Sequence, residues 1–450
     1  MIKVFLLCLI WCSSYLFVGG QNPLMIIFIL VLCLSAGYFY KNDKLNLTNL
    51  LLISGIGFVY LLTYSFNYDN FLSPYGDDAL FLRESKNQDL SYLNIFPTFL
   101  KTLRFITDIF DFNDQDFLYV AYLSSWILYA LLINLSHKVF ERVVKLRINL
   151  SLYSTFLIGL YLIQWSFVHV YRDLILFYLV FLGINYLLNK KYLIVFIIMI
   201  PVFFLRGATF FSVTFACFLF RYRELLLNGS TLFIKSVKIS ILTFLAIILS
   251  GAFVYIVPYI SRFGNIEGND SNADIVSFLD KRTNFVESNE EIQDQVTYKI
   301  MQQSWIVKVI ALPTVNIITP VKYSGLVIDN KRVSFKYQIQ YLNEYFDFSN
   351  FFQISHLFVL SIFLPLLVIN VKKYFNYSPE SFALIIISLV FMLSISFISF
   401  VPRHRILFLI PLSAIAATRF KDYAYYKLKP FHIIILIILV FYNLMNSGII

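Results

Sequence analysis

Long apolar runs, separated by short polar segments, recur from one end of the chain to the other. Many contain 15 to 22 residues, close to the roughly 20 that an α-helix needs to cross a bilayer. We therefore expect an all-α polytopic integral membrane protein, a single domain over 1–450 with about 13 transmembrane helices (11–13). The expected spans lie near 4–19, 22–40, 46–66, 117–136, 148–168, 174–188, 192–205, 208–220, 239–260, 351–371, 381–400, 406–418 and 431–449.

Composition points to the same class. The chain is 59% hydrophobic and only 14% charged, whereas soluble domains carry about a quarter charged residues. This excludes a soluble enzyme, a secreted disulfide scaffold and a disordered chain. The cysteines lie inside apolar runs and are typical of small apolar core residues, not of disulfides or metal ligands. Lys3 precedes the first run as in a signal peptide, but no clear cleavage site follows, so we expect a retained helix.

Positive charge is distributed unevenly among the polar segments. Cytoplasmic loops of membrane proteins carry an excess of Lys and Arg, which predicts a cytoplasmic N-terminus and a periplasmic C-terminus. Two long loops, 67–116 and 261–350, then fall on the periplasmic side, and the first carries nine acidic against four basic residues. Topology thus accounts for the net charge of +10 without a nucleic-acid partner. The basic segments are 41–44, 137–147, 190–191, 221–238, 372–373 and 419–429.

The first periplasmic loop contains an adjacent acid pair, Asp77 and Asp78, after Gly76. Two adjacent carboxylates repel each other, so one keeps its proton near neutrality when partly buried. Such a pair can act as a general base or bind a divalent cation; a solvated loop pair is the alternative. Apolar residues recur at helical spacing over 91–112, which predicts a helix lying in the membrane interface.

Three further polar clusters fall on the same predicted face: Arg172 and Asp173, then Arg206, then Arg403, His404 and Arg405. Charged residues at membrane depth are costly and tend to mark sites, and guanidinium groups bind phosphate through paired hydrogen bonds. The arginines therefore predict a site for a phosphate or pyrophosphate headgroup. Pairing of Arg172 with Asp173, and snorkelling of the other arginines to the membrane surface, are the alternatives.

The second periplasmic loop, 261–350, begins polar and becomes apolar over 306–321, where Pro313 and Pro320 interrupt it. This apolar part is too short and too broken to span a bilayer. We expect a re-entrant or interfacial element, which either covers the site or serves as a structural plug.

The motifs together resemble those of the GT-C superfamily of membrane glycosyltransferases and of the bacterial O-antigen and exopolysaccharide polymerases that share its plan. The resemblance covers most of 70–225 and 380–420. The matching motifs are short: Gly76-Asp77-Asp78 at the start of an outer loop, Tyr171-Arg172-Asp173 at a later outer turn, Arg206-Gly207-Ala208-Thr209 before a short span, and Pro402-Arg403-His404-Arg405 followed by Pro411-Leu412.

The resemblance implies a GT-C-like fold and sugar transfer from a polyprenyl-linked donor at the periplasmic face of the bacterial inner membrane. Its leaving group is a lipid phosphate or pyrophosphate, whose developing charge arginines stabilise. It implies no cofactor, with a divalent cation left open at the acid pair. The implied roles are a general base at Asp77 or Asp78, His404 as a substitute base, phosphate binding by Arg172, Arg206, Arg403 and Arg405, and a supporting Asp173.

Within this class we favour a polymerase of undecaprenyl pyrophosphate-linked repeat units of an O-antigen or capsule. The extra spans, the arginine-rich face and two long outer loops favour it over the alternative, a GT-C enzyme that moves a single sugar. A lipid-linked oligosaccharide flippase is the second alternative, although the span interiors are nearly free of charge. The implied partners are an undecaprenyl-linked oligosaccharide, membrane lipid, a chain-length regulator and a flippase.

Overall fold

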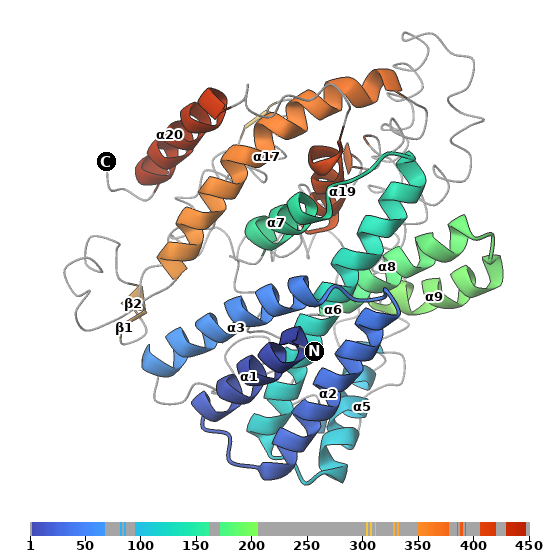
Figure 1. Ribbon diagram of the computed structural model, residues 1–450, viewed down its shortest axis with the longest axis vertical. Coiled ribbons are helices and arrows are strands. Elements are labelled where there is room, and N and C mark those ends of the chain that lie inside the picture. Colours follow the sequence, from blue (N-terminus) through green and yellow to red (C-terminus); the bar gives the residue numbers. More distant parts are fainter. Residues whose placement is uncertain are drawn as a thin grey trace.

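The computed structural model describes residues 2–67, 95–161, 172–205, 349–377, 406–419 and 429–446, with isolated positions between them. Helices make up almost all of this part of the chain (Figure 1). A two-residue antiparallel pair, β1 (Val327–Ile328) with β2 (Lys331–Arg332), is the only sheet within it. The helices are α1 (Ile2–Phe17), α2 (Pro23–Lys41), α3 (Leu47–Asn67), α5 (Ile95–Ile109), α6 (Asp114–Val144), α7 (Leu150–Tyr161), α8 (Arg172–Leu188), α9 (Tyr192–Leu205), α17 (Ser349–Tyr377), α19 (Ile406–Ala417) and α20 (Lys429–Asn446).

Most of the expected spans coincide with helices. α1, α2, α3, α8, α9, α19 and α20 begin and end within three residues of the predicted boundaries. The spans expected at 208–220 and 239–260 lie outside the described residues, as does most of 381–400. The number of spans, the GT-C-like arrangement and the element expected at 306–321 therefore stay predictions.

α6 extends beyond its predicted span, 117–136, at both ends. At its start the Asn113 side chain accepts from the Asp116 N–H, and the Asp116 carboxylate accepts from the Asn113 N–H, a capping box that fixes the first turn. Its end is set at Lys145, which has a left-handed φ of 57° and donates its N–H to the Glu141 carbonyl. Capping groups, which hydropathy does not register, determine both boundaries.

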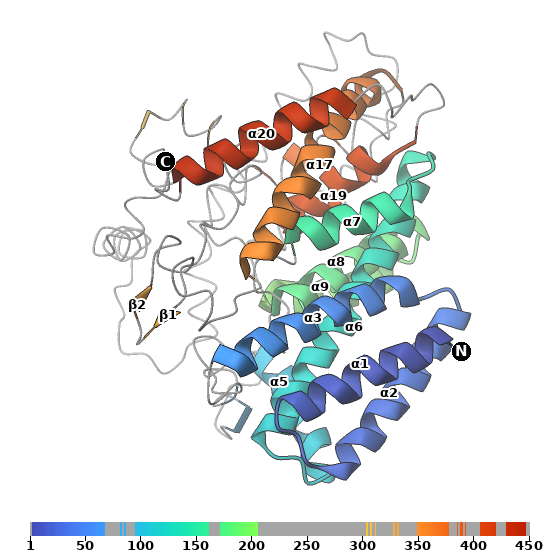
Figure 2. The ribbon, with the colours of Figure 1, turned by 60° about the vertical axis from the view of Figure 1, so that its left-hand side comes forward.

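α6 lies at the centre of the described helices. It contacts α3, α5, α7, α8 and α19. In Figures 1 and 2, α1, α2 and α3 lie in the lower part of the bundle and α17, α19 and α20 in its upper part, and α6 reaches from one to the other. Gly57 of α3 permits close packing, because a Cβ there would meet the Trp126 ring of α6 at 2.4 Å. Small residues bring helices together in this way where lipid removes the hydrophobic drive for association.

The outer helices carry an apolar exterior. Large apolar side chains of α1, α2, α9 and α20 are exposed, among them Leu34, Leu193 and Ile437, and surfaces of this extent are unfavourable in water. Among the described residues, three segments are long and apolar enough to cross a membrane: Pro23–Lys41, Asp114–Val144 and Ser355–Tyr374. Of their apolar windows, 22% is buried in the first and 72% in the second. The described helices thus form a membrane-embedded bundle with α6 inside and α2 facing outward.

The side where α6 begins is called the acidic end, after Asp108, Asp111, Asp114 and Asp116. α1 reaches it with its last turn, where the Tyr15 hydroxyl donates to Asp116 Oδ1 at 2.6 Å. The loop that starts α2 lies there too, because Asn22 Nδ2 is 3.5 Å from Asp116 Oδ2.

The side where α6 ends is called the basic end, after Lys138, Arg142, Lys145 and Arg147. α1 begins there, since Lys3 Nζ donates to Thr48 Oγ1 at the start of α3 at 2.8 Å. α2 finishes there, with an ion pair of 2.6 Å between Asp43 and Lys138.

The remaining helices follow the same alternation. Near the end of α6, Arg142 donates a hydrogen bond to Asn189, the residue just after α8. α8 therefore runs from the acidic side toward the basic end, and α9 runs back toward the acidic side. α19 finishes at the basic end, where the Ala417 carbonyl accepts from the Asn149 N–H. α17 is tied to the same place because Asn370 Nδ2 donates to the Ile415, Ala416 and Thr418 carbonyls.

Candidate functional site

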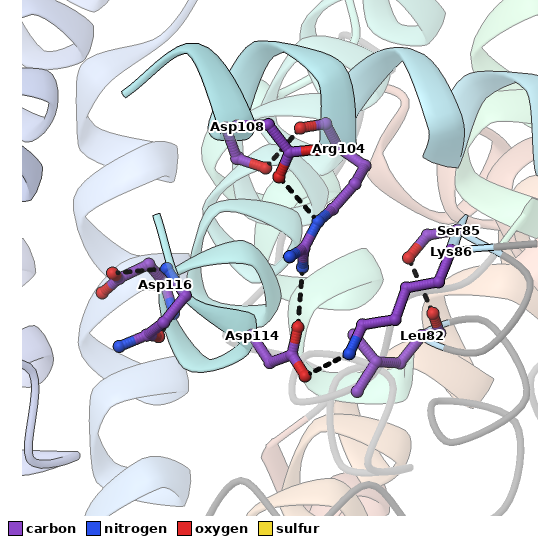
Figure 3. Close-up of polar contacts among 9 residues, drawn as sticks. Leu82, Ser85, Lys86, Arg104, Asp108, Asp114 and Asp116 are labelled. Atoms are coloured by element: carbon purple, nitrogen blue, oxygen red, sulfur yellow. Dashed lines mark hydrogen bonds and ion pairs between the residues drawn. The ribbon is translucent and has the colours of Figure 1, made fainter. Parts of the chain in front are cut away.

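Four charged side chains meet where α5 turns into α6 (Figure 3). Arg104 Nε lies 2.8 Å from Asp108 Oδ1, and Arg104 Nη1 lies 2.8 Å from Asp114 Oδ1. The second oxygen of Asp114 accepts from Lys86 Nζ at 2.5 Å. Arg104 is the least exposed member, with 18% of its side chain accessible. One carboxylate thus joins the segment that contains Lys86 to both helices of the α5–α6 hairpin.

Local sequence explains why this hairpin forms. α5 ends at a tight turn in which Asp111 adopts a left-handed φ of 54° and the Phe112 N–H donates to the Thr107 carbonyl. The Asn113 cap then starts α6. The Arg104 guanidinium lies 5.4 Å from the centre of the Phe117 ring, a cation–π contact that holds it against α6. The Arg104 side chain can therefore pair with Asp108 of α5 and with Asp114 of α6 at the same time.

Asp116 forms the second polar centre of the acidic end. It is 1% exposed and accepts from the Tyr15 hydroxyl at 2.6 Å and the Asn113 N–H at 3.1 Å, with Asn22 Nδ2 at 3.5 Å. A buried carboxylate is costly unless hydrogen bonds replace its water, and these donors do so. Asp116 therefore serves to join α1, the α1–α2 loop and α6.

The carboxyl group of Asp114 has an altered acidity. α6 is 31 residues long, about 46 Å at 1.5 Å per residue, so its first turn projects beyond a hydrocarbon layer of about 30 Å. Partial burial would raise the pKa of Asp114, but the hydrogen bonds and charges of Lys86 and Arg104 outweigh it and lower this pKa below its ordinary value. Asp114 is held in its ionised form at neutral pH.

Most residues predicted for the site lie outside the described residues: Asp77, Asp78, Arg206, Arg403, His404 and Arg405. For Arg172 and Asp173 the structure describes the backbone alone, as the first turn of α8. Their assigned roles therefore stay predictions. The helix expected within 91–112 is present as α5, whereas its position in the membrane interface stays a prediction.

Helix directions nevertheless relate three of the predicted positions. α8 begins at Arg172, α9 ends at Leu205 next to Arg206 in sequence, and α19 begins at Ile406 next to Arg405. Because α8 and α19 run toward the basic end and α9 runs away from it, all three helix termini are directed toward the acidic side.

Sequence reasoning did not identify the charged network of Lys86, Arg104, Asp108 and Asp114. One signal was available, since Arg104 and Asp108 are four residues apart on a helix and so share a face. No comparable signal exists for Lys86 with Asp114, which are 28 residues apart. Among the described residues, no group of three or more His, Cys, Asp and Glu side chains is arranged to hold a metal ion.

Comparison of the chain with protein-family models, with curated proteins and with solved structures found no match.

Proposed function

We propose that this protein is a membrane-embedded glycosyltransferase that polymerises undecaprenyl pyrophosphate-linked oligosaccharide units into a bacterial surface polysaccharide. The observation that carries the proposal is the common direction of three helix termini next to Arg172, Arg206 and Arg405. These termini point toward the end of the bundle that also holds the acidic network. A site for a diphosphate leaving group needs arginines that converge from different helices.

The chemistry follows from these residue types. A hydroxyl of the acceptor saccharide attacks the anomeric carbon of the donor, the new glycosidic bond forms, and the bond from that carbon to the pyrophosphate oxygen breaks. Asp77 or Asp78 takes the hydroxyl proton, with His404 as the alternative base. Arg172, Arg206, Arg403 and Arg405 stabilise the charge that develops on the departing undecaprenyl pyrophosphate.

The charged network includes a residue that is close in sequence to the proposed base. Lys86 follows Asp78 by eight residues in the sequence, and its ion pair with Asp114 anchors that segment to the start of α6. Arg104 braces the same carboxylate from α5. Lys86 is thereby attached to the start of α6, the helix at the centre of the described bundle.

Charge distribution favours glycosyl transfer over flipping. A flippase requires polar groups along a path open to both sides, yet α6 has no Asp, Glu, Lys or Arg between Phe117 and Ser136. Its charged residues are confined to the two ends. A polymerase also needs room for two lipid-linked chains, and the loops 67–116 and 261–350 can supply it.

Arg206→Ala tests the proposal. In cells whose chromosomal copy is deleted, the variant should leave single repeat units on the lipid anchor and abolish the polysaccharide ladder seen on a gel. Arg147→Ala removes an exposed arginine at the basic end and is the matched control, which should restore the ladder. Equal amounts of both variants in membranes exclude a folding defect.

Two outcomes would overturn the polymerase proposal. A ladder of normal length with Arg206→Ala would remove Arg206 from the site. A full ladder that lacks one side-branch sugar in the deletion strain would identify the single-sugar transferase instead.

A further inference from the structure

Four cations lie where α6 ends and α8 turns into α9. Their side chains are exposed, and Arg142 Nη1 donates to Asn189 Oδ1 at 3.0 Å and lies 3.4 Å from Asn185 Oδ1, which joins the two parts. This group is called the cationic corner and consists of Arg142, Lys145, Lys190 and Lys191.

Within the two segments that form it, the cationic corner carries more positive than negative charge. In the two segments that form it, 141–146 and 185–192, the sole acidic residue is Glu141, whose Oε1 accepts from the Ile148 N–H at 3.0 Å. The C-termini of α6 and α8 add about half a negative charge each. The N-terminus of α9, at Tyr192, adds about half a positive charge, so positive charge stays in excess within these two segments.

An apolar face begins directly beside the cationic corner. α9 starts at Tyr192, the residue after Lys191, and exposes 73% of Leu193, 67% of Phe196 and 55% of Ile197. Ile200 continues this row, which is spaced as one face of a helix. Cations at the end of a helix and an apolar stripe along it match the two parts of a lipid molecule.

We propose that the cationic corner and the exposed face of α9 bind one anionic phospholipid. Arg142, Lys190 and Lys191 contact its phosphate, since guanidinium and ammonium groups are strong donors to phosphate oxygens. Its acyl chains lie along Leu193 and Phe196. A water-soluble acidic partner would satisfy the cations but would leave the apolar stripe uncovered, so the stripe decides in favour of lipid. This site is distant from the proposed transfer chemistry and does not depend on it.

Lipid binding to the purified protein in neutral detergent tests the proposal. Native mass spectrometry counts bound molecules during a titration with phosphatidylglycerol, with phosphatidylcholine as the uncharged reference. The double variant Lys190→Gln/Lys191→Gln keeps the bonds of Arg142. It should bind phosphatidylglycerol on the order of tenfold more weakly, as expected for two basic residues near a headgroup, with phosphatidylcholine binding unchanged.

The control removes two cations from the same end of the bundle. Lys44→Gln/Lys372→Gln changes two exposed lysines and should retain the wild-type affinity. If both double variants bound phosphatidylglycerol equally weakly, the effect would be a general attraction between positive charge and anionic lipid. If neither variant lost affinity, the cationic corner would not be a lipid site. Either result overturns the proposal.

A second variant tests the apolar stripe. Leu193→Asn/Phe196→Asn leaves all four cations in place and should weaken phosphatidylglycerol binding without affecting glycerol phosphate. Glycerol phosphate that bound as tightly as phosphatidylglycerol to the wild type would indicate a soluble anion and overturn the lipid assignment.

Discussion

The two ends of α6 manage charge in opposite ways. At the acidic end, Asp114 and Asp116 take their partners from α1, the α1–α2 loop, α5 and the segment around Lys86. At the basic end, Asp43 and Lys138 also pair across elements, but cations outnumber acids in 137–147 and most of them are exposed, as Arg142 and Arg147 are. Charges that pair across elements fix the positions of those elements. Charges that stay exposed remain available to membrane lipid or to water.

The acidic residues at the two ends differ in burial and in the range of their hydrogen bonds. Asp116 is buried and accepts hydrogen bonds from Tyr15 of α1 and from the Asn113 cap of its own helix. Glu141 exposes 37% of its side chain and serves a local turn, with the Ile148 N–H as donor and His137 Nε2 at 3.7 Å. Asp116 therefore joins two helices, whereas Glu141 stabilises a turn within one segment.

The largest effect is expected from a test of sidedness. Gln115→Cys at the acidic end and Lys44→Cys at the basic end both replace exposed residues. By the rule that basic ends face the cytoplasm, a membrane-impermeant maleimide should label Gln115→Cys in cells with a permeabilised outer membrane. Lys44→Cys should react only after lysis.

The wild-type chain is the control, because its cysteines lie in apolar runs and should give little background. The reverse pattern would place the acidic end in the cytoplasm and remove the proposed site from the periplasm. Labelling of both variants before lysis would show that the reagent had entered the cell.

A smaller effect is expected from Asp116→Ala. The substitution leaves the buried Tyr15 hydroxyl without its acceptor, which costs about 1 to 3 kcal/mol. It also removes the side chain that completes the capping box with Asn113, which costs about 1 kcal/mol more. We expect the free energy of unfolding to fall by about 3 kcal/mol, measured by chemical denaturation of the detergent-solubilised protein.

Two variants calibrate this value. Gln115→Ala changes an exposed neighbour in the same turn and should be nearly neutral. Glu141→Ala at the basic end should cost about 1 kcal/mol, because its hydrogen bond is partly accessible to solvent. An equal loss for Glu141→Ala and Asp116→Ala would contradict the difference between the ends.

Hydropathy predicted where helices lie better than where they stop. α9 coincides with its predicted span, 192–205, because its whole length is apolar. α6 runs eight residues past its predicted end at 136, because His137–Val144 is charged yet still packs Val139, Phe140 and Val143 inward. Hydropathy averages over a segment, whereas a helix continues as long as one face is buried and a cap has not ended it.

The polar centres were harder to predict for a related reason. The arginine and acid motifs could be listed from sequence, because charge in an apolar chain stands out. Which residue meets which depends on contacts between distant segments, as for Tyr15 with Asp116, 101 residues apart. Periodicity within one helix carries no information about such pairs.

The smallest effect is expected from the ionisation of Asp114 at the acidic end. The pKa of Asp114 is lowered below its ordinary 3.8 when the protein is folded, so the folded state binds fewer protons than the unfolded state at a given pH. Its contribution to stability is therefore present above pH 3.8 and is lost as the pH falls through the lowered value. Asp114 is 41% exposed, so solvent screening keeps this contribution below about 1 kcal/mol.

Asp114→Asn measures this contribution directly. Its difference in unfolding free energy from the wild type should be full at about pH 6 and should shrink as the solution is acidified past 3.8. High salt, about 1 M, should reduce the difference at pH 6 as well, since the screening length falls to about 3 Å. A difference that grew on acidification would mean that burial outweighs Lys86 and Arg104, and the acidic end would then hold a protonated carboxyl instead of an ion network.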